Sequence, residues 1–246
     1  RQRQMCIRDS GGGMYNNWCD VTVTDCIFSD NLANHNGGAL YNTSSRVTVR
    51  SCVFATNRAY DGGAVYMNGI AGEDTTRLEN CLMSGNTAYV SGGALYLLKS
   101  SSSVINCTIA GNAAAYGGGI SCWHSEADFV NCIVWENVAY GIYPAIEIGT
   151  EILPDVICCD MDQEGYGAEG SGAADEDGNI RLDPLFAGGS MTYFLSQTAA
   201  GQASDSPCVD AAAETPVSTW LIGYRTTRTD RVPDEYRTDI GFHYAR

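Results

Sequence analysis

Residues 81–96 read Cys-Leu-Met-Ser-Gly-Asn-Thr-Ala-Tyr-Val-Ser-Gly-Gly-Ala-Leu-Tyr. A cysteine is followed five residues later by an asparagine, and then by a Gly-Gly step that leads into an aliphatic residue and a tyrosine. The same order recurs along the chain, with successive cysteines 26, 29, 26 and 25 residues apart. The cysteine and asparagine pairs are Cys26/Asn31, Cys52/Asn57, Cys81/Asn86, Cys107/Asn112 and Cys132/Asn137.

A fixed period of this length indicates a solenoid or a propeller. Residues 21–23 and 47–49 alternate valine with threonine, which favours strands, and no stretch carries a sustained helical stripe. A propeller blade of the WD type needs about 40–45 residues, whereas the shorter period here fits one coil of three short strands. We therefore predict an all-β, right-handed parallel β-helix, a pectin-lyase-like solenoid of about six coils over residues 11–149.

Three corners of each coil are predicted from the repeat: the polar residue before each cysteine, the recurrent asparagine, and the Gly-Gly step. We expect the asparagines to stack and to hydrogen-bond along the coil axis. The repeated cysteines share one phase and apolar flanks, so we expect an inward column of free thiols. Pairing stays open for Cys19, Cys122, Cys158, Cys159 and Cys208.

Both ends of the chain depart from the repeat. Residues 4–10 resemble the translation of a sequencing adapter, so residues 1–10 are interpreted as an artefact and left out of the fold. The natural N-terminus and any signal peptide are then expected to lie outside this sequence. We expect residues 150–246 to form a last irregular coil and a C-terminal cap, because an open coil exposes unpaired strand edges.

The formal net charge of -15, with Lys99 as the only lysine, argues against binding to nucleic acid or to anionic membranes. No apolar run approaches the roughly 20 residues of a membrane span. We expect no cofactor and a monomeric protein. Asp175, Asp177 and Asn179 have the composition of a calcium loop without a complete EF-hand pattern, and solvated acidic loops are the favoured interpretation.

Tyrosines follow four of the Gly-Gly steps and are expected to face outward, because their aliphatic neighbours suit the core. Such a strip could stack against sugar rings, although a self-stacked ladder that covers its own surface is the favoured interpretation. The four residues are Tyr15, Tyr41, Tyr66 and Tyr96.

Two family resemblances rest on short motifs. Phe28-x-x-Asn31 and Phe54-x-x-Asn57, followed by Gly-Gly-Ala-Leu and Gly-Gly-Ala-Val, resemble the FxxN and GGA[ILV] repeats of polymorphic outer membrane proteins. Residues 183–186 (Asp-Pro-Leu-Phe), 206–211 (Ser-Pro-Cys-Val-Asp-Ala) and 239–244 (Asp-Ile-Gly-Phe-His-Tyr) resemble the C-terminal part of choice-of-anchor β-helix proteins. The first resemblance implies a bacterial surface adhesin, and the second a segment that closes the helix and often precedes an anchor.

Together these features predict a non-catalytic extracellular or cell-surface module, adhesin-like or a stalk, that contacts glycans or another surface component. The alternative is a polysaccharide lyase, a glycoside hydrolase or a carbohydrate-binding module, with its site on residues 67–76 or 97–103 or in the C-terminal region. Against an enzyme, the paired aspartates, the Gly-His-Gly step and the Arg-x-Lys step of related hydrolases are missing. No repeat phase is shared by the candidate cations Arg46, Arg50, Arg58, Arg77 and Lys99.

Overall fold

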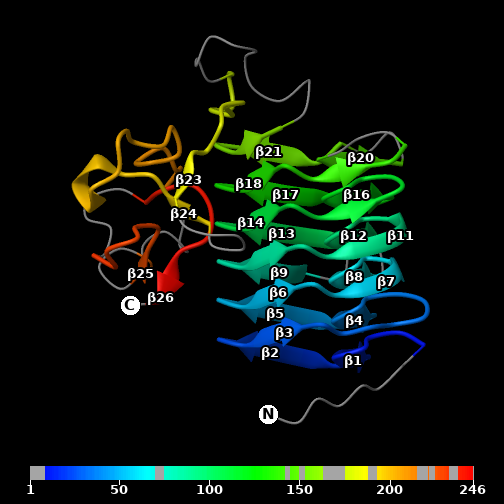
Figure 1. The fold of residues 1–246 in the computed structure, drawn as a ribbon. Helices are drawn as coiled ribbons and strands as arrows, with labels where there is room; N and C mark the ends of the chain where they lie inside the picture. Colours follow the sequence, from blue (N-terminus) through cyan, green and yellow to red (C-terminus); the bar gives the residue numbers. More distant parts are fainter. Residues whose placement is uncertain are drawn as a thin grey trace.

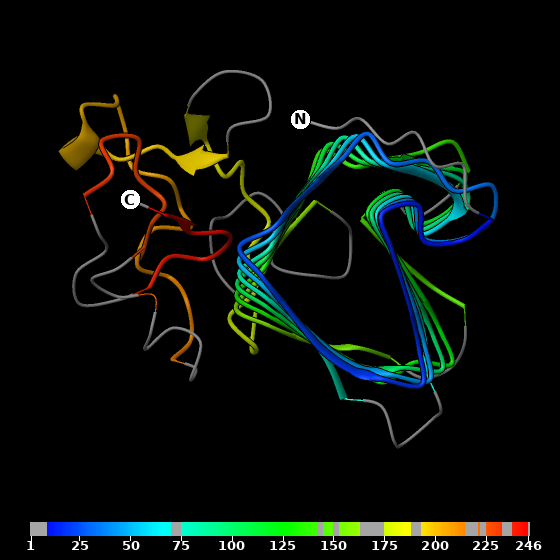
Figure 2. The same cartoon turned by 90° about the horizontal axis from the view of Figure 1, so that it is seen from below.

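The chain winds into a stack of coils, with a second, irregular layer of chain along one side (Figure 1). Viewed along the stack, the coils superimpose as one outline with a re-entrant corner (Figure 2). Strands of successive coils pair in parallel and in sequential order, which confirms the predicted right-handed parallel β-helix. The computed structural model describes residues 9–69, 75–141, 145–149, 153–162, 175–187, 193–214, 221, 225–232 and 238–245.

The strands form four parallel sheets, numbered I to IV in the order in which a coil enters them. Sheet I contains β1 (Met14–Asn17), β4 (Leu40–Thr43), β8 (Val65–Asn68), β12 (Leu95–Leu98), β16 (Ile120–Trp123) and β20 (Ile146–Ile148). Sheet II contains β2 (Asp20–Thr24), β5 (Arg46–Arg50), β9 (Thr75–Glu79), β13 (Ser101–Ile105), β17 (Ala127–Val130) and β21 (Asp155–Ile157).

Sheets III and IV complete each coil. Sheet III contains β3 (Ile27–Ser29), β6 (Val53–Ala55), β10 (Leu82–Ser84), β14 (Thr108–Ala110), β18 (Ile133–Trp135) and β22 (Asp160–Met161). Sheet IV contains β7 (Arg58–Asp61), β11 (Thr87–Ser91), β15 (Ala113–Ala114) and β19 (Val138–Ala139). Outside the stack lie the antiparallel pairs β23 (Phe186–Ala187) with β24 (Phe194–Leu195) and β25 (Arg225–Thr226) with β26 (Tyr244–Ala245), and the short 3-10 helix η1 (Thr198–Ala200). No helix in the described chain has the length and apolar character of a membrane span.

The repeat predicts three strands per coil, and the structure has four because the chain turns once more after sheet I. Residues with φ between 47° and 53° make this extra corner, namely Trp18, Ser44, Lys99 and His124. The side chain that follows the corner can then accept a hydrogen bond from the preceding coil. Oγ of Ser45, which follows Ser44, accepts the backbone N–H of Cys19 at 3.0 Å. The four corner residues share no chemistry, so the sequence did not mark them. Residues 97–103 consequently contain this corner and no projecting loop.

The two predicted polar corners use the same left-handed backbone. The residues before the repeated cysteines have φ between 52° and 56°: Asp25, Ser51, Asn80, Asn106 and Asn131. The residues before the asparagines also have positive φ: Asp30, Thr56, Gly85, Gly111 and Glu136. Aspartate, asparagine and glycine adopt this conformation more readily than other residues. Each turn points the next side chain, cysteine or asparagine, toward the coil interior.

The asparagines form one continuous column at the corner between sheets III and IV. In each of Asn31, Asn57, Asn86 and Asn112, the backbone N–H and the side-chain amide donate to Oδ1 of the next asparagine at 2.8–3.0 Å. From the second asparagine onward, each amide also donates to a backbone carbonyl of the preceding coil, at 2.8–3.0 Å. The column therefore satisfies buried backbone groups that the sheets leave without partners.

Asn137 is the last member of the asparagine column within the described residues. Its Oδ1 accepts both donors of Asn112, and its amide donates to the backbone carbonyl of Ile109 at 2.8 Å. In the next coil β22 ends at Met161, and residues 163–174 lie outside the described residues. The expected stacking along the axis therefore holds for Asn137 on the side of Asn112, where it serves as an acceptor.

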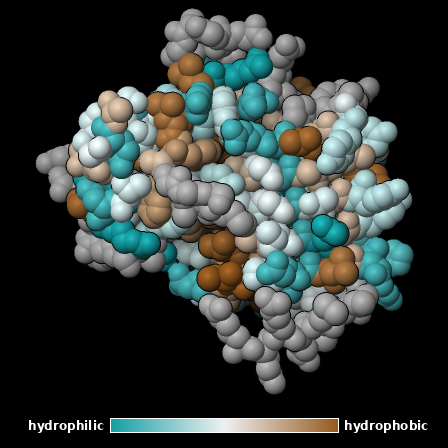
Figure 3. Space-filling model, viewed as in Figure 1, coloured by the Kyte–Doolittle hydropathy of each residue, from teal (hydrophilic) through white to brown (hydrophobic). Residues whose placement is uncertain are grey.

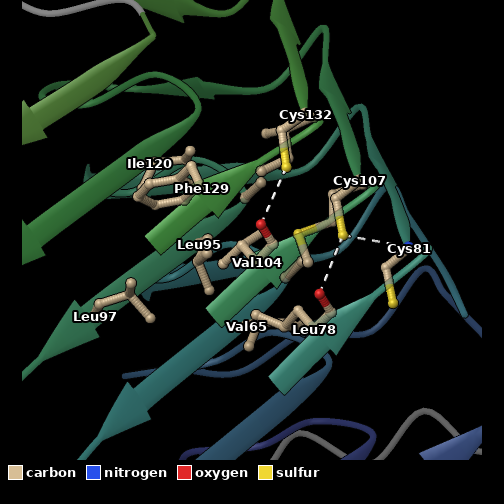
Figure 4. Close-up of a cluster of buried hydrophobic side chains, with 14 of the residues drawn as sticks. Val65, Leu78, Cys81, Leu95, Leu97, Val104, Cys107, Ile120, Phe129 and Cys132 are labelled. Carbon is tan, nitrogen blue, oxygen red and sulfur yellow. Dashed lines mark hydrogen bonds between the residues drawn. The ribbon is translucent and has the colours of Figure 1, made fainter. Parts of the chain in front are cut away.

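A parallel column of thiols lines the corner between sheets II and III (Figure 4). The backbone N–H of Cys81 donates to Sγ of Cys107 at 3.3 Å, and that of Cys132 donates to Sγ of Cys159, also at 3.3 Å. Cys159 thus extends the predicted column, although the repeat did not include it. Every described cysteine is a free thiol, and Cys26 in the first described coil is exposed.

The C-terminal layer covers the outer face of sheet III. A second apolar cluster joins the two, formed by Ile133, Ile180, Leu195, Cys208, Ala212 and Ile240. Two corner asparagines also hydrogen-bond to the C-terminal layer. The side chain of Asn80 makes two hydrogen bonds to the backbone of His243, at 2.7 and 3.0 Å. The side chain of Asn131 likewise makes two to the backbone of Ala213. The described part of residues 193–245 therefore packs against the side of the coils, whereas the expected cap would close their end (Figure 1).

We predict that Asn86→Leu lowers the free energy of unfolding by at least about 2 kcal/mol, because the change removes the acceptor of the Asn57 backbone N–H and the donor to the Phe54 carbonyl, both buried. The control is Lys99→Asn, since Lys99 is exposed and asparagine suits its left-handed backbone. Urea melts of both variants give the comparison. Equal midpoints would show that the column does not stabilise the coils.

Candidate functional site

The inner tyrosine row, Tyr15, Tyr41, Tyr66 and Tyr96, lies on the outer face of sheet I. Successive rings stack with centroids 5.0, 5.2 and 4.9 Å apart and with interplanar angles of 10° or less. Each inner ring face is therefore covered by its neighbour, and Tyr66 is only 6 % exposed. Sugars stack on free ring faces, so this row presents mainly ring edges to a ligand and stabilises its own sheet.

Carboxylates border the later end of the inner tyrosine row. In the next two coils its register position is taken by Ser121 and Glu147, whose side chains are joined by a hydrogen bond of 2.7 Å from the hydroxyl to Oε2. Burial, together with the nearby carboxylates of Asp61 and Glu147, raises the pKa of Tyr96 to about 12. The corner between sheets IV and I is therefore an acidic part of the surface.

A second set of tyrosines, the outer tyrosine row, lies on sheet IV and its extension. Tyr60, Tyr89, Tyr116 and Tyr140 are 47, 75, 44 and 82 % exposed. The rings of Tyr60 and Tyr89 lie 5.7 Å apart with a tilt of 31°. The repeat did not reveal this row, although tyrosine stands three residues after the asparagine of the column in three coils. These exposed rings make the outer tyrosine row the better candidate for ligand contact.

Acids and cations also meet on the outer face of sheet II. Glu79 is almost fully buried and pairs with Arg50 at 2.5 Å and with Arg77 at 3.8 Å. Asp128 and Asp155 lie opposite each other in register two coils further on. Burial raises the pKa of Asp128, and the charge of Asp155 adds to the shift. Glu79 thus offsets part of the positive charge that Arg50 and Arg77 place on this face.

An open cleft lies between the coils and the C-terminal layer. Its wall is formed by Trp135, Glu136, Asp183, Leu185, Phe186, Ala187, Ser196 and Ser204. It combines aromatic rings with two carboxylates and hydroxyl groups. No basic side chain belongs to this described lining, so the cleft does not favour an anionic ligand.

The predicted calcium residues form a hydrogen-bonded turn at the top of the cysteine column. Oδ1 of Asp175 accepts the backbone N–H groups of Asp177 and Asn179, at 3.0 and 2.8 Å. The Asn179 side chain is buried and takes the next position of the column, accepting the N–H of Cys159 at 2.9 Å. These oxygens therefore have partners within the protein. Across the described residues, no group of three or more His, Cys, Asp and Glu side chains is arranged to hold a metal ion.

Asp160 is the fully buried carboxyl at the junction of the last coil and the C-terminal layer. Its oxygens accept the backbone N–H of Leu182 at 3.1 Å and the thiol of Cys208 at 3.2 Å. Burial raises the pKa of Asp160 to about 7, and the nearby charges of Asp183 and Asp162 act in the same direction. The junction therefore contains a carboxyl that titrates near neutral pH.

Comparison with protein families identifies the coils. The family model described as the right-handed β-helix region matches residues 9–146, more than half of the chain. The chain belongs to the right-handed β-helix family. Comparison with curated proteins gives no significant match, and neither does comparison with solved structures. Membership of the right-handed β-helix family assigns the fold, and function has to be argued from the surface.

We predict that the stability of this β-helix falls as the pH rises from about 4 to about 7. In this window folded Asp160 retains its proton, with a pKa of about 7, while in the unfolded chain the carboxyl ionises near 3.8. The unfolded state then binds fewer protons, so the free energy of unfolding decreases with pH. This carboxyl alone accounts for a decrease on the order of 4 kcal/mol.

Asp160→Asn keeps the shape of the side chain but cannot ionise, so it should flatten this part of the curve. Denaturant melts between about pH 4 and pH 8 would measure the effect, with Asp20→Asn, an exposed carboxyl on β2, as the control. Parallel curves for the wild type and Asp160→Asn would contradict the prediction.

Proposed function

We propose that this β-helix is a non-catalytic module of an extracellular or cell-surface protein, a bacterial stalk or adhesin-like element that works as a monomer and contacts glycans or another surface component. The observation that carries the proposal is the continuity of the stack. Three sheets hold six strands each, and the asparagine and cysteine columns run through successive coils. Such a structure is rigid along its axis and repeats the same outer surface from coil to coil.

Two further features support this function. The FxxN and GGA[ILV] motifs resemble those of surface adhesins, and the coils contain these motifs at their corners. The face seen in Figure 3 is mostly hydrophilic, with hydrophobic residues in small separate patches. Small patches favour a protein that stays monomeric and exposed to water.

The alternative, a carbohydrate-active enzyme, has one observation in its favour. Asp128 and Asp155 lie one coil apart, about 4.8 Å between strands, and a pair of carboxylates can act as acid and nucleophile. Both carboxyls are exposed on a sheet face, however, outside the cleft described above. Of the loops predicted to carry an enzyme site, residues 70–74 lie outside the described residues.

We predict no cleavage of polygalacturonate or pectin, with or without calcium. The substrate is a polyanion and the chain carries a net charge of -15, so long-range repulsion disfavours encounter. The assay follows unsaturated product by absorbance and reducing ends by colorimetry. Sustained turnover that is lost in Asp128→Asn and retained in the control Asp20→Asn would establish the enzyme instead.

A further inference from the structure

The outer tyrosine row contains a gap. Thr87 pairs with Ala113 and Ser91 with Tyr116, so Tyr89 and Val90 together lie across from Ala115 at a β-bulge; Ala114 pairs with Ala139, so Ala115 faces Tyr140 in the next coil. An alanine therefore separates two strongly exposed rings. Strands of neighbouring coils lie about 4.8 Å apart, so the two rings are anchored about 10 Å apart with the Ala115 methyl group between them.

A third tyrosine borders this slot on one side. Tyr116 follows Ala115 directly and is 44 % exposed. A side chain at position 141 would collide with the Ala115 backbone and with this ring, since a Cβ added to Gly141 would lie 2.7 Å from the Ala115 carbonyl oxygen and 3.0 Å from Cε1 of Tyr116. Glycine at 141 thus makes room for the Tyr116 ring beside Tyr140. The slot over the Ala115 methyl group is thus flanked by three tyrosines whose side chains are all exposed to solvent.

The charges around the slot are negative. Asp61 lies in register with Ser91, which in turn lies in register with Tyr116. Glu147 approaches the residue after Tyr116, since its Cβ would lie 3.0 Å from a Cβ added to Gly117. The carboxyl of Asp61 also interacts electrostatically with Glu147. The basic residue of β7, Arg58, stands in a different column two coils before Ala115.

We propose that the slot between Tyr89 and Tyr140 binds a quaternary ammonium or similar organic cation. A cation midway between rings anchored about 10 Å apart lies about 5 Å from each, within the roughly 6 Å range of a cation–π interaction. The flanking carboxylates and the net charge of -15 attract a cation and repel an anion. This site goes beyond the proposed glycan contact, because it selects positive charge.

The test is calorimetric titration of the whole chain with choline chloride. The matched probe is 3,3-dimethylbutanol, which has the same shape with carbon in place of the charged nitrogen, and cellobiose serves as a neutral sugar. We expect choline to bind with a dissociation constant in the millimolar range or lower. We also expect it to bind at least about tenfold more tightly than its neutral analogue, a difference in binding free energy of about 1.4 kcal/mol. Added salt should weaken binding because the attraction is electrostatic.

Variants locate the site. Tyr89→Ala and Tyr140→Ala should each weaken choline binding about tenfold, and Ala115→Tyr should abolish it by filling the slot while the fold is retained. The control is Tyr15→Ala, which removes a 47 % exposed ring from sheet I and should leave binding unchanged. Circular dichroism melts verify that each variant folds.

Absence of choline binding, equal binding of its neutral analogue, or equal affinity of the slot variants and the wild type would overturn this proposal. Binding of cellobiose without choline would also overturn it, and would at the same time support the glycan contact of the proposed function. Failure of both ligands would overturn the slot proposal and leave the stalk role standing, since that role rests on the coil stack.

Discussion

At the corners of a β-helix the ladder of backbone hydrogen bonds turns, and buried N–H groups would lose their regular partners at a cost of about 1–3 kcal/mol each. In this chain a residue with left-handed backbone makes the turn, and the side chain after it accepts a hydrogen bond from a backbone N–H of the neighbouring coil. Asparagine does so between sheets III and IV, cysteine between sheets II and III, and a serine hydroxyl after sheet I. This arrangement allows the coils to stack in register.

Stacking in register also determines the chemistry of the outer surface, because it places equivalent side chains about 4.8 Å apart. Where every coil supplies a tyrosine, the rings cover one another, as between Tyr41 and Tyr66. Where one coil supplies alanine, as at Ala115, ring faces on both sides become accessible. The same repeat thus produces a self-covered row on sheet I and an open slot on sheet IV.

The C-terminal layer depends on the corners as well. The amides of Asn80 and Asn131 project from the coils and bind backbone groups of the chain that returns along sheet III. This packing buries Asp160 at the junction, where burial and neighbouring acids raise its pKa to about 7. Contact between the coils and the C-terminal layer is therefore coupled to protonation.

The fold, the period, and the asparagine and cysteine columns could be predicted from the sequence, because each depends on spacing that a linear pattern records. The sequence did not determine the corner after sheet I, where Lys99 and His124 share a backbone conformation and no chemistry. Nor did it determine which tyrosines are exposed, that Asn137 only accepts from its neighbour in the column, or that Asn179 continues the cysteine column. Exposure and pairing are set by what the adjacent coil places beside a side chain, some 20–29 residues away in the chain, so they depend on how the coils stack.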